Sequence, residues 1–158
     1  LSIADKDAAT LTAAVERITP ADPSTILTTV VDVTSSAAVN TWIESTVAHF
    51  GRLDGAANMA GAIGHKHGIG KLIDQEDDEW DMLLRVNMTG LMYCLRAELR
   101  SIIATTGKGS IVNAASIQGL RGFACHAAYS ATKHGVIGLS KSVAKEVGEN
   151  IRINVIAP

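Results

Sequence analysis

The sequence lacks a set of paired cysteines, an excess of charge and a long hydrophobic run, and each shortage excludes a class of protein. Two cysteines, Cys94 and Cys125, are too few for a disulfide framework in a chain of 158 residues. We therefore expect free thiols in a reducing compartment, the cytosol. The net charge of −2 gives no electrostatic basis for a nucleic-acid partner. No apolar run is long enough to cross a bilayer, so we expect no membrane partner.

The composition is that of a globular protein with a sizeable core. Hydrophobic residues make up 47% of the chain and charged residues 19%, which is typical of a well-buried fold rather than of disorder. A chain of this length is also long enough for one domain with a real core. We therefore expect a single domain over residues 1–158.

Five short apolar runs alternate with segments that show helical periodicity. The runs expected to form strands are 1–4, 26–31, 53–57, 110–114 and 151–155. The expected helices are 8–18, ended by Pro20 and Pro23, then 35–50, 77–105, and one that includes Tyr129 and continues to about 147. This alternation predicts an α/β fold with a doubly wound, mostly parallel sheet between two layers of helices.

Polar or small residues follow the predicted strands one after another. Asp5, Asp32, 58–61 and Ser116 all stand where a strand ends. Ligands of open parallel sheets bind outside the carboxyl ends of the strands. The pattern therefore predicts a ligand site along this edge of the sheet.

The pair Tyr129 and Lys133 has the spacing of two side chains on one helix face, one turn apart. A free tyrosine has a pKa of about 10, and a nearby ammonium group favours the phenolate. A tyrosine tuned in this way can act as a general acid or base on an alcohol or a carbonyl. Ser116 could hydrogen-bond the same substrate oxygen. The alternative is a half-buried tyrosine beside a solvated lysine, which the spacing alone does not exclude.

Two histidines, His65 and His67, lie in a glycine-rich stretch after the third predicted strand. A metal site needs further ligands at suitable spacing, and neither a carboxylate nor a cysteine supplies one. We therefore predict a solvated loop and no metal.

Five motifs in register resemble the classical branch of the short-chain dehydrogenase/reductase family, and the resemblance covers the whole chain. They are Asn58-Met-Ala-Gly61, Val86-Asn87-Met-Thr-Gly90, Asn113-Ala-Ala-Ser116, the step from Ser116 to Tyr129 and Lys133, and Arg152-Ile-Asn154-Val-Ile-Ala-Pro158. Met59 departs from the family pattern, which has asparagine there. The resemblance implies a Rossmann-type fold and hydride transfer between a nicotinamide cofactor and an alcohol or ketone substrate.

The resemblance also implies roles for individual residues. Tyr129 would be the general acid/base, Lys133 would lower its pKa and bind the nicotinamide ribose, Ser116 would orient the substrate oxygen, and Asn87 would support a proton relay. Cofactor-binding residues would be Asp5, Asp32, Val33, Asn58, Ala60 and Gly61, together with Tyr129 and Lys133. Substrate-pocket residues would be Ile117, Gln118, Phe123 and Cys125, which indicate a mostly apolar small molecule. The family's pairing of long helices implies a homo-oligomer, a dimer or a tetramer.

Asp5 bears on which cofactor is used. A carboxylate after the second strand of such folds binds the adenosine ribose and repels a 2′-phosphate. This favours NAD over NADP, with the alternative that Asp5 is an ordinary turn residue.

The family's first strand, its glycine-rich phosphate turn and its last strand have no counterpart in the sequence. Because the first strand lies mid-sheet in the order 3-2-1-4-5-6, we expect two unpaired strand edges at the centre. Two other functions therefore stay open. One is a non-catalytic fragment or assembly module that binds no dinucleotide, and the other is an epimerase or dehydratase with tightly held NAD.

Overall fold

The structure is a computed structural model that describes residues 1–18 and 23–158, so the predicted helix end at Pro20 lies outside it. The strands are β1 (Ser2–Asp5), β2 (Leu27–Val30), β3 (Gly55–Asn58), β4 (Gly109–Ala114) and β5 (Ile151–Ile156). The helices are α1 (Ala8–Arg17), α2 (Ser36–Phe50), α3 (Asp77–Leu84), α4 (Leu91–Thr105) and α5 (Ala127–Glu146). Four helical turns are η1 (Pro23–Thr25), η2 (Leu72–Asp74), η3 (Arg85–Gly90) and η4 (Ile117–Gly119). The five predicted strands are confirmed, each end within two residues of the prediction.

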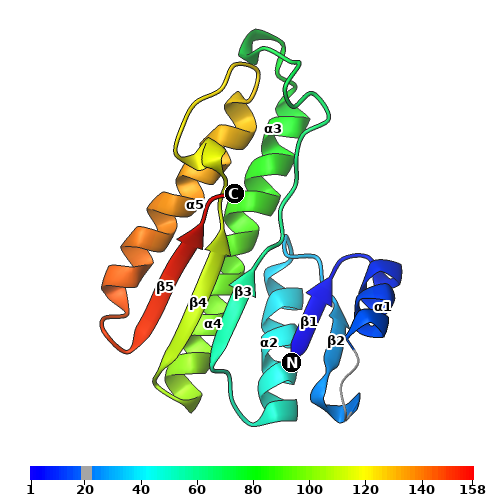
Figure 1. Ribbon diagram of the computed structural model, residues 1–158, viewed down its shortest axis with the longest axis vertical. Helices are drawn as coiled ribbons and strands as arrows, with labels where there is room; N and C mark the ends of the chain where they lie inside the picture. Colours follow the sequence, from blue (N-terminus) through cyan, green and yellow to red (C-terminus); the bar gives the residue numbers. More distant parts are fainter. Residues whose placement is uncertain (19–22) are drawn as a thin grey trace.

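The strands form two separate parallel sheets. β1 pairs with β2, and β3, β4 and β5 pair in that order. Figure 1 shows β1 and β3 as the facing edges of the two sheets, with the strands arranged β2, β1, β3, β4, β5. The expectation of two unpaired edges at the centre is confirmed, since no hydrogen-bonded ladder joins β1 to β3 among the described residues.

Helix packing joins the two sheets where strand pairing does not. α2 packs along α4, and the buried residues of both belong to one hydrophobic cluster with Val31 and Ile111. A polar contact adds to this link, because Trp42 Nε1 and Thr46 Oγ1 on α2 both donate to Ser2 Oγ on β1 at 2.8 Å. The connection between the halves is therefore a helical layer beneath the sheets.

Local signals set the ends of α2. By residue type either Thr34 or Ser35 is suited to cap the helix; Ser35 is the N-cap, since its Oγ accepts from the Ala38 backbone N–H at 3.2 Å. Gly51 ends the helix with a φ of 79°, in the left-handed region that favours glycine. The chain then turns into β3.

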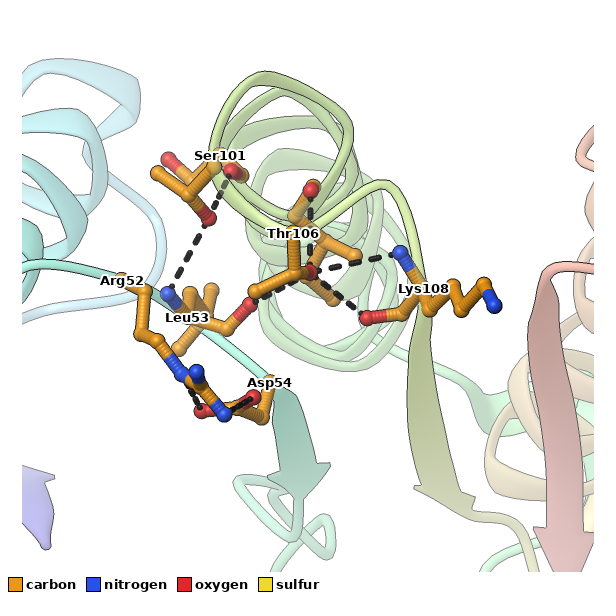
Figure 2. Close-up of polar contacts among 8 residues, drawn as sticks. Arg52, Leu53, Asp54, Ser101, Thr106 and Lys108 are labelled. Atoms are coloured by element: carbon orange, nitrogen blue, oxygen red, sulfur yellow. Dashed lines mark hydrogen bonds and ion pairs between the residues drawn. The ribbon is translucent and has the colours of Figure 1, made fainter.

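Hydroxyl groups fix the N-terminal ends of β3 and β4 together (Figure 2). Thr106 Oγ1 lies 2.6 Å from the Lys108 carbonyl oxygen and 3.5 Å from that of Leu53. Arg52 Nη2 pairs with Asp54 Oδ1 at 2.7 Å beside them. These contacts hold the edge of the sheet opposite the predicted ligand site.

The predicted helix 77–105 is interrupted by the π-helical turn η3, which contains Asn87. The apolar spacing predicts a buried stripe of Trp80, Leu84, Leu91 and Leu95. Leu91 and Leu95 are buried, whereas Trp80 and Leu84 are half-buried and Leu83 is buried instead. One row of buried residues recurs every fourth position, at 79, 83, 87, 91 and 95, beside further buried residues at 90, 94, 97 and 98. A four-residue repeat drifts around an uninterrupted α-helix, and the wider π-turn absorbs that drift.

Candidate active site

Tyr129 and Lys133 lie on one face of α5, near the carboxyl end of β4. The Lys133 Nζ lies 5.6 Å from the centroid of the Tyr129 ring and donates to the Ala114 carbonyl oxygen at 2.8 Å. Lys133 is buried, with 4% of its surface exposed, and this burial lowers the pKa of its ammonium group. The lysine is therefore not the solvated neighbour of the alternative interpretation.

Asn87 ties the loop after β3 to α5. Its Oδ1 accepts from the Ala62 backbone N–H at 2.7 Å, and its Nδ2 donates to the Ala62 carbonyl oxygen at 3.0 Å and to Thr132 Oγ1 at 3.1 Å. A Cβ on Gly61 would lie 3.4 Å from Asn87 Oδ1 and 3.5 Å from Lys133 Nζ. Gly61, Asn87 and Lys133 therefore lie next to one another.

Ser116 follows β4 and caps η4. Its hydroxyl lies 3.3 Å from the Gln118 backbone N–H, from which it accepts, and 3.3 Å from the Pro158 carbonyl oxygen, to which it donates. In the described part of the chain no hydrogen bond joins Ser116 to Tyr129 or Lys133. The structure places it at the same sheet edge without a direct contact to them.

Three of the predicted cofactor-binding residues line one recess. Val33, Asn58 and Ala60 surround it together with Val86, Gly90, Leu91 and Cys94. A Cβ on Gly90 would lie 2.8 Å from Val33 Cγ2, so glycine is needed there for this close approach. Asp32 beside the recess accepts from Thr34 N–H and Oγ1 at 2.9 and 2.8 Å, and these bonds lower the pKa of the Asp32 carboxyl.

Asp5 ends β1 and is exposed. Its Oδ1 accepts from the Asp7 backbone N–H at 2.9 Å, so one carboxylate oxygen serves the turn into α1. Asp5 therefore acts as a turn residue, which is the alternative interpretation of the sequence. Its position at a strand end is also the position expected for a residue that binds the adenosine ribose.

The Asn58 side chain belongs to a polar network that includes Glu98 on α4 and Asn113 on β4. Its Nδ2 donates to Glu98 Oε2 at 2.9 Å and to Asn113 Oδ1 at 3.0 Å, and Asn113 Nδ2 donates to Ser140 Oγ at 2.9 Å. Glu98 is fully buried, and this burial raises the pKa of its carboxyl to about 7. Sequence reasoning missed this network, because a glutamate within a helix is usually a solvated residue.

Glu79 holds the loop between β3 and α3 and was also missed. Its Oε1 accepts from the Lys66 backbone N–H at 3.2 Å and lies 2.9 Å from His65 Nδ1, while Oε2 accepts from Gln75 Nε2 at 2.9 Å. Burial raises the pKa of the Glu79 carboxyl, but the hydrogen bonds outweigh it, so the pKa is lowered. A Cβ on Gly64 would lie 2.5 Å from Oε1, which explains the glycine.

The prediction of a solvated loop is right for His65, which is exposed, and wrong for His67. The His67 ring is half-buried and lies edge-on to Tyr129 with centroids 5.0 Å apart. No group of three potential metal-ligating side chains occurs in residues 1–18 and 23–158.

Three of the four predicted pocket residues lie near His67, His126 or Tyr129. Gln118 Nε2 lies 3.3 Å from His67 Nε2, Cys125 lines a recess with Tyr129, and Phe123 lies 6.0 Å from the ring of His126. Ile117 sits on η4 beside them and is partly exposed. The sequence analysis did not predict His126 as a residue of this site. The signal that could have indicated it is its position directly before the helix that carries Tyr129.

The residues present fit the two ends of a nicotinamide dinucleotide. The recess around Val33 is lined mostly by apolar residues, and Gly61 has no side chain beside the buried Lys133 ammonium. Lys133 and Tyr129 would hold the ribose next to the nicotinamide, where hydride is exchanged.

Comparisons with known proteins agree with this geometry. A family model described as enoyl-(acyl carrier protein) reductase matches residues 1–158. A short-chain dehydrogenase/reductase of Pyricularia oryzae, ABA4, is 55% identical over 131 residues, which are 82% of this chain and 48% of the relative. The chain thus spans about half the length of the curated relatives it matches.

Solved structures show the same fold. ElxO with NADP bound has a TM-score of 0.88 and 32% identity, covering 99% of this chain and 62% of that one. NAD⁺-bound xylitol dehydrogenase has a TM-score of 0.86 and 29% identity, covering 99% and 59%. In the described residues no helix has the length and apolar character needed to cross a membrane. On these motifs, this fold and these relatives, the chain belongs to the short-chain dehydrogenase/reductase family of oxidoreductases.

Proposed function

We propose that this chain is the catalytic core of an NAD(H)-linked dehydrogenase or reductase that interconverts an alcohol and a ketone. The observation that carries the proposal is the buried Lys133 ammonium, held at the end of β4 and facing the ring of Tyr129. A buried cation beside a phenol favours the phenolate, which is what a proton-transferring tyrosine needs.

In the proposed mechanism the bound nicotinamide dinucleotide supplies the hydride for reduction or accepts it in oxidation. During reduction Tyr129 donates its phenolic proton to the substrate oxygen, and Ser116 Oγ donates a hydrogen bond that orients the same oxygen. Lys133 stabilises the phenolate that forms. Asn87 fixes the loop after β3 against α5 and supports the return of a proton toward Lys133.

We propose that NAD is preferred to NADP because the exposed Asp5 carboxylate would repel a 2′-phosphate. The substrate would be a small, mostly apolar molecule. This proposal is supported by the exposed apolar side chains in the segment between Ser116 and α5, which are Ile117, Leu120 and Phe123. We also propose a cytoplasmic homo-oligomer, a dimer or a tetramer, supported by the two free cysteines and by the family's usual pairing of long helices.

The test is Tyr129→Phe in the full-length protein, measured as NADH-dependent turnover of a panel of cyclic and open-chain ketones. Removing the hydroxyl removes the proton donor, so we expect a loss of about 10²-fold or more in kcat. Tyr93→Phe is the matched control, since Tyr93 lies on α4 against Arg96 and should leave turnover unchanged. Unchanged turnover in Tyr129→Phe would refute the mechanism.

A further inference from the structure

A row of rings from two separate loops leads to Tyr129. His67, in the loop after β3, lies edge-on to the Tyr129 ring at 5.0 Å with an interplanar angle of 82°. His126, directly before α5, lies edge-on to His67 at 4.2 Å, and Phe123 follows at 6.0 Å. Edge-to-face contacts at these distances are directional. The row therefore restricts how the Tyr129 ring can turn.

A hydrogen bond fixes the protonation of His67. Gln118 Nε2 lies 3.3 Å from His67 Nε2, and because an amide nitrogen can only donate, the imidazole nitrogen must accept. His67 is then neutral, with its proton on Nδ1. Gln118 Oε1 in turn lies 3.4 Å from Ser130 Oγ, which donates to it, so the pair is anchored beside Tyr129 on α5.

The backbone also holds His67 in place. The Gly68 N–H donates to the Cys125 carbonyl oxygen at 2.9 Å, which joins the two loops directly next to the rings. Cys125 has a φ of 63°, a left-handed conformation that is unfavourable for a residue with a Cβ. Such strain persists only where the surroundings enforce it, and it is common at functional sites.

We propose that His67 is a positioning residue for Tyr129. The neutral His67 ring, held by Gln118 and His126, orients the Tyr129 phenol toward the substrate. The inference rests on the proposed function, because Tyr129 is the residue that His67 orients. His67 acts through Tyr129 and is not itself the proton donor. A change at His67 should therefore alter turnover and the pH dependence of turnover, and should leave cofactor binding unchanged.

The proposal implies sensitivity to pH. Burial lowers the pKa of the His67 imidazolium, and so does His126, while Glu79 opposes them. The titratable side chains that line the same recess are Lys66, Glu79, Cys125, His126 and Tyr129. A protonated His67 can no longer accept from Gln118, so the arrangement is present above the lowered pKa and is lost as the pH falls through it.

The kinetic test uses His67→Ala and His67→Phe, with His49→Phe on α2 as the control. We expect kcat to fall about tenfold in His67→Ala, with the KM for NADH within about twofold of the wild-type value. His67→Phe should recover most of that loss and should lack the acidic limb of the wild-type pH profile. Wild-type turnover in His67→Ala, or an unchanged acidic limb in His67→Phe, would overturn the proposal.

A second readout needs no turnover and separates this inference from the proposed function. In NMR titrations the Tyr129 ring resonances should move with the His67 titration, whereas those of Tyr93 should not. The His67 imidazole should carry its proton on Nδ1 and titrate below the ordinary histidine range. If Tyr129 follows His67 but no ketone is reduced, only the proposed function fails. If the enzyme is active but the Tyr129 resonances do not move with the His67 titration, only the positioning role fails.

Discussion

Glu98 is an ionisable residue in a fully buried environment. It has no exposed surface, one carboxylate oxygen accepts from Asn58, and Oε1 has no hydrogen-bond partner in the described part of the chain. Its pKa is raised to about 7, so the folded state keeps the proton over a range in which the unfolded chain has lost it. The side chain therefore couples folding to pH.

This coupling predicts how stability changes with pH. The stabilisation by a protonated Glu98 is full below the unfolded pKa of about 4.3 and is lost as the pH rises to about 7, a change of about 4 kcal/mol. Glu98→Gln cannot ionise, so its free energy of unfolding should not show this decrease. Urea denaturation between pH 4.5 and 8 measures the difference, with the exposed Glu44→Gln as control. Parallel pH profiles for Glu98→Gln and the wild type would contradict the prediction.

At the residue scale the sequence predicted the groups whose role follows from spacing. The four-residue step from Tyr129 to Lys133 is fixed by helix geometry, and the structure places both on one face. Glu98 and His67 could not be found in this way, because their burial depends on segments remote in sequence. Asn58, the partner of Glu98, and Gln118, the partner of His67, are too far away in the sequence for a local pattern to connect each pair.

At the element scale, the close contact of η4 with α5 depends on one glycine. A Cβ on Gly119 would lie 2.6 Å from the Lys133 carbonyl oxygen and 2.9 Å from Ile137 Cδ1. Gly119→Ala should therefore push η4 away from α5 and cost about 1–3 kcal/mol of stability. The turn carries Ser116 at its start, so the displacement would also reach the candidate site.

Gly122 supplies the matched control for this prediction. It lies three residues further on, and a Cβ there would meet nothing within 4 Å. Gly122→Ala should change the unfolding free energy by less than about 0.5 kcal/mol. Equal urea midpoints for the two alanine variants would show that the η4–α5 contact does not limit stability.

The sequence predicted element types better than their internal geometry. Alternating apolar runs and the caps at Ser35 and Gly51 are local signals, and they located the strands and α2. The π-turn η3 was missed because it results from packing against α5 and the loop after β3, where Asn87 is bonded. A helical period read from sequence alone assumes an unbroken α-helix.

At the scale of the whole molecule, the candidate cofactor residues come from both sheets. Asp5, Asp32 and Val33 follow strands of the β1–β2 sheet, whereas Asn58, Gly61 and Lys133 belong to the β3–β4–β5 side. The two sheets share no strand pairing in the described residues, and the packing of α2 along α4 links them. A dinucleotide bound at these positions would therefore bridge the two sheets.

Bridging predicts that cofactor binding stabilises both sheets together. A ligand present at 100 times its Kd stabilises the folded state by about 2.7 kcal/mol. We expect NADH to slow amide hydrogen exchange both at 32–34 and at 58–62, and to raise the Tm more than NADPH at equal concentration, because Asp5 repels a 2′-phosphate. Asp5→Ser should reduce the difference between the two cofactors, while Asp81→Ser on the exposed face of α3 should leave it unchanged. Protection confined to one sheet would contradict the bridging geometry, and a larger shift with NADPH would contradict the role of Asp5 alone.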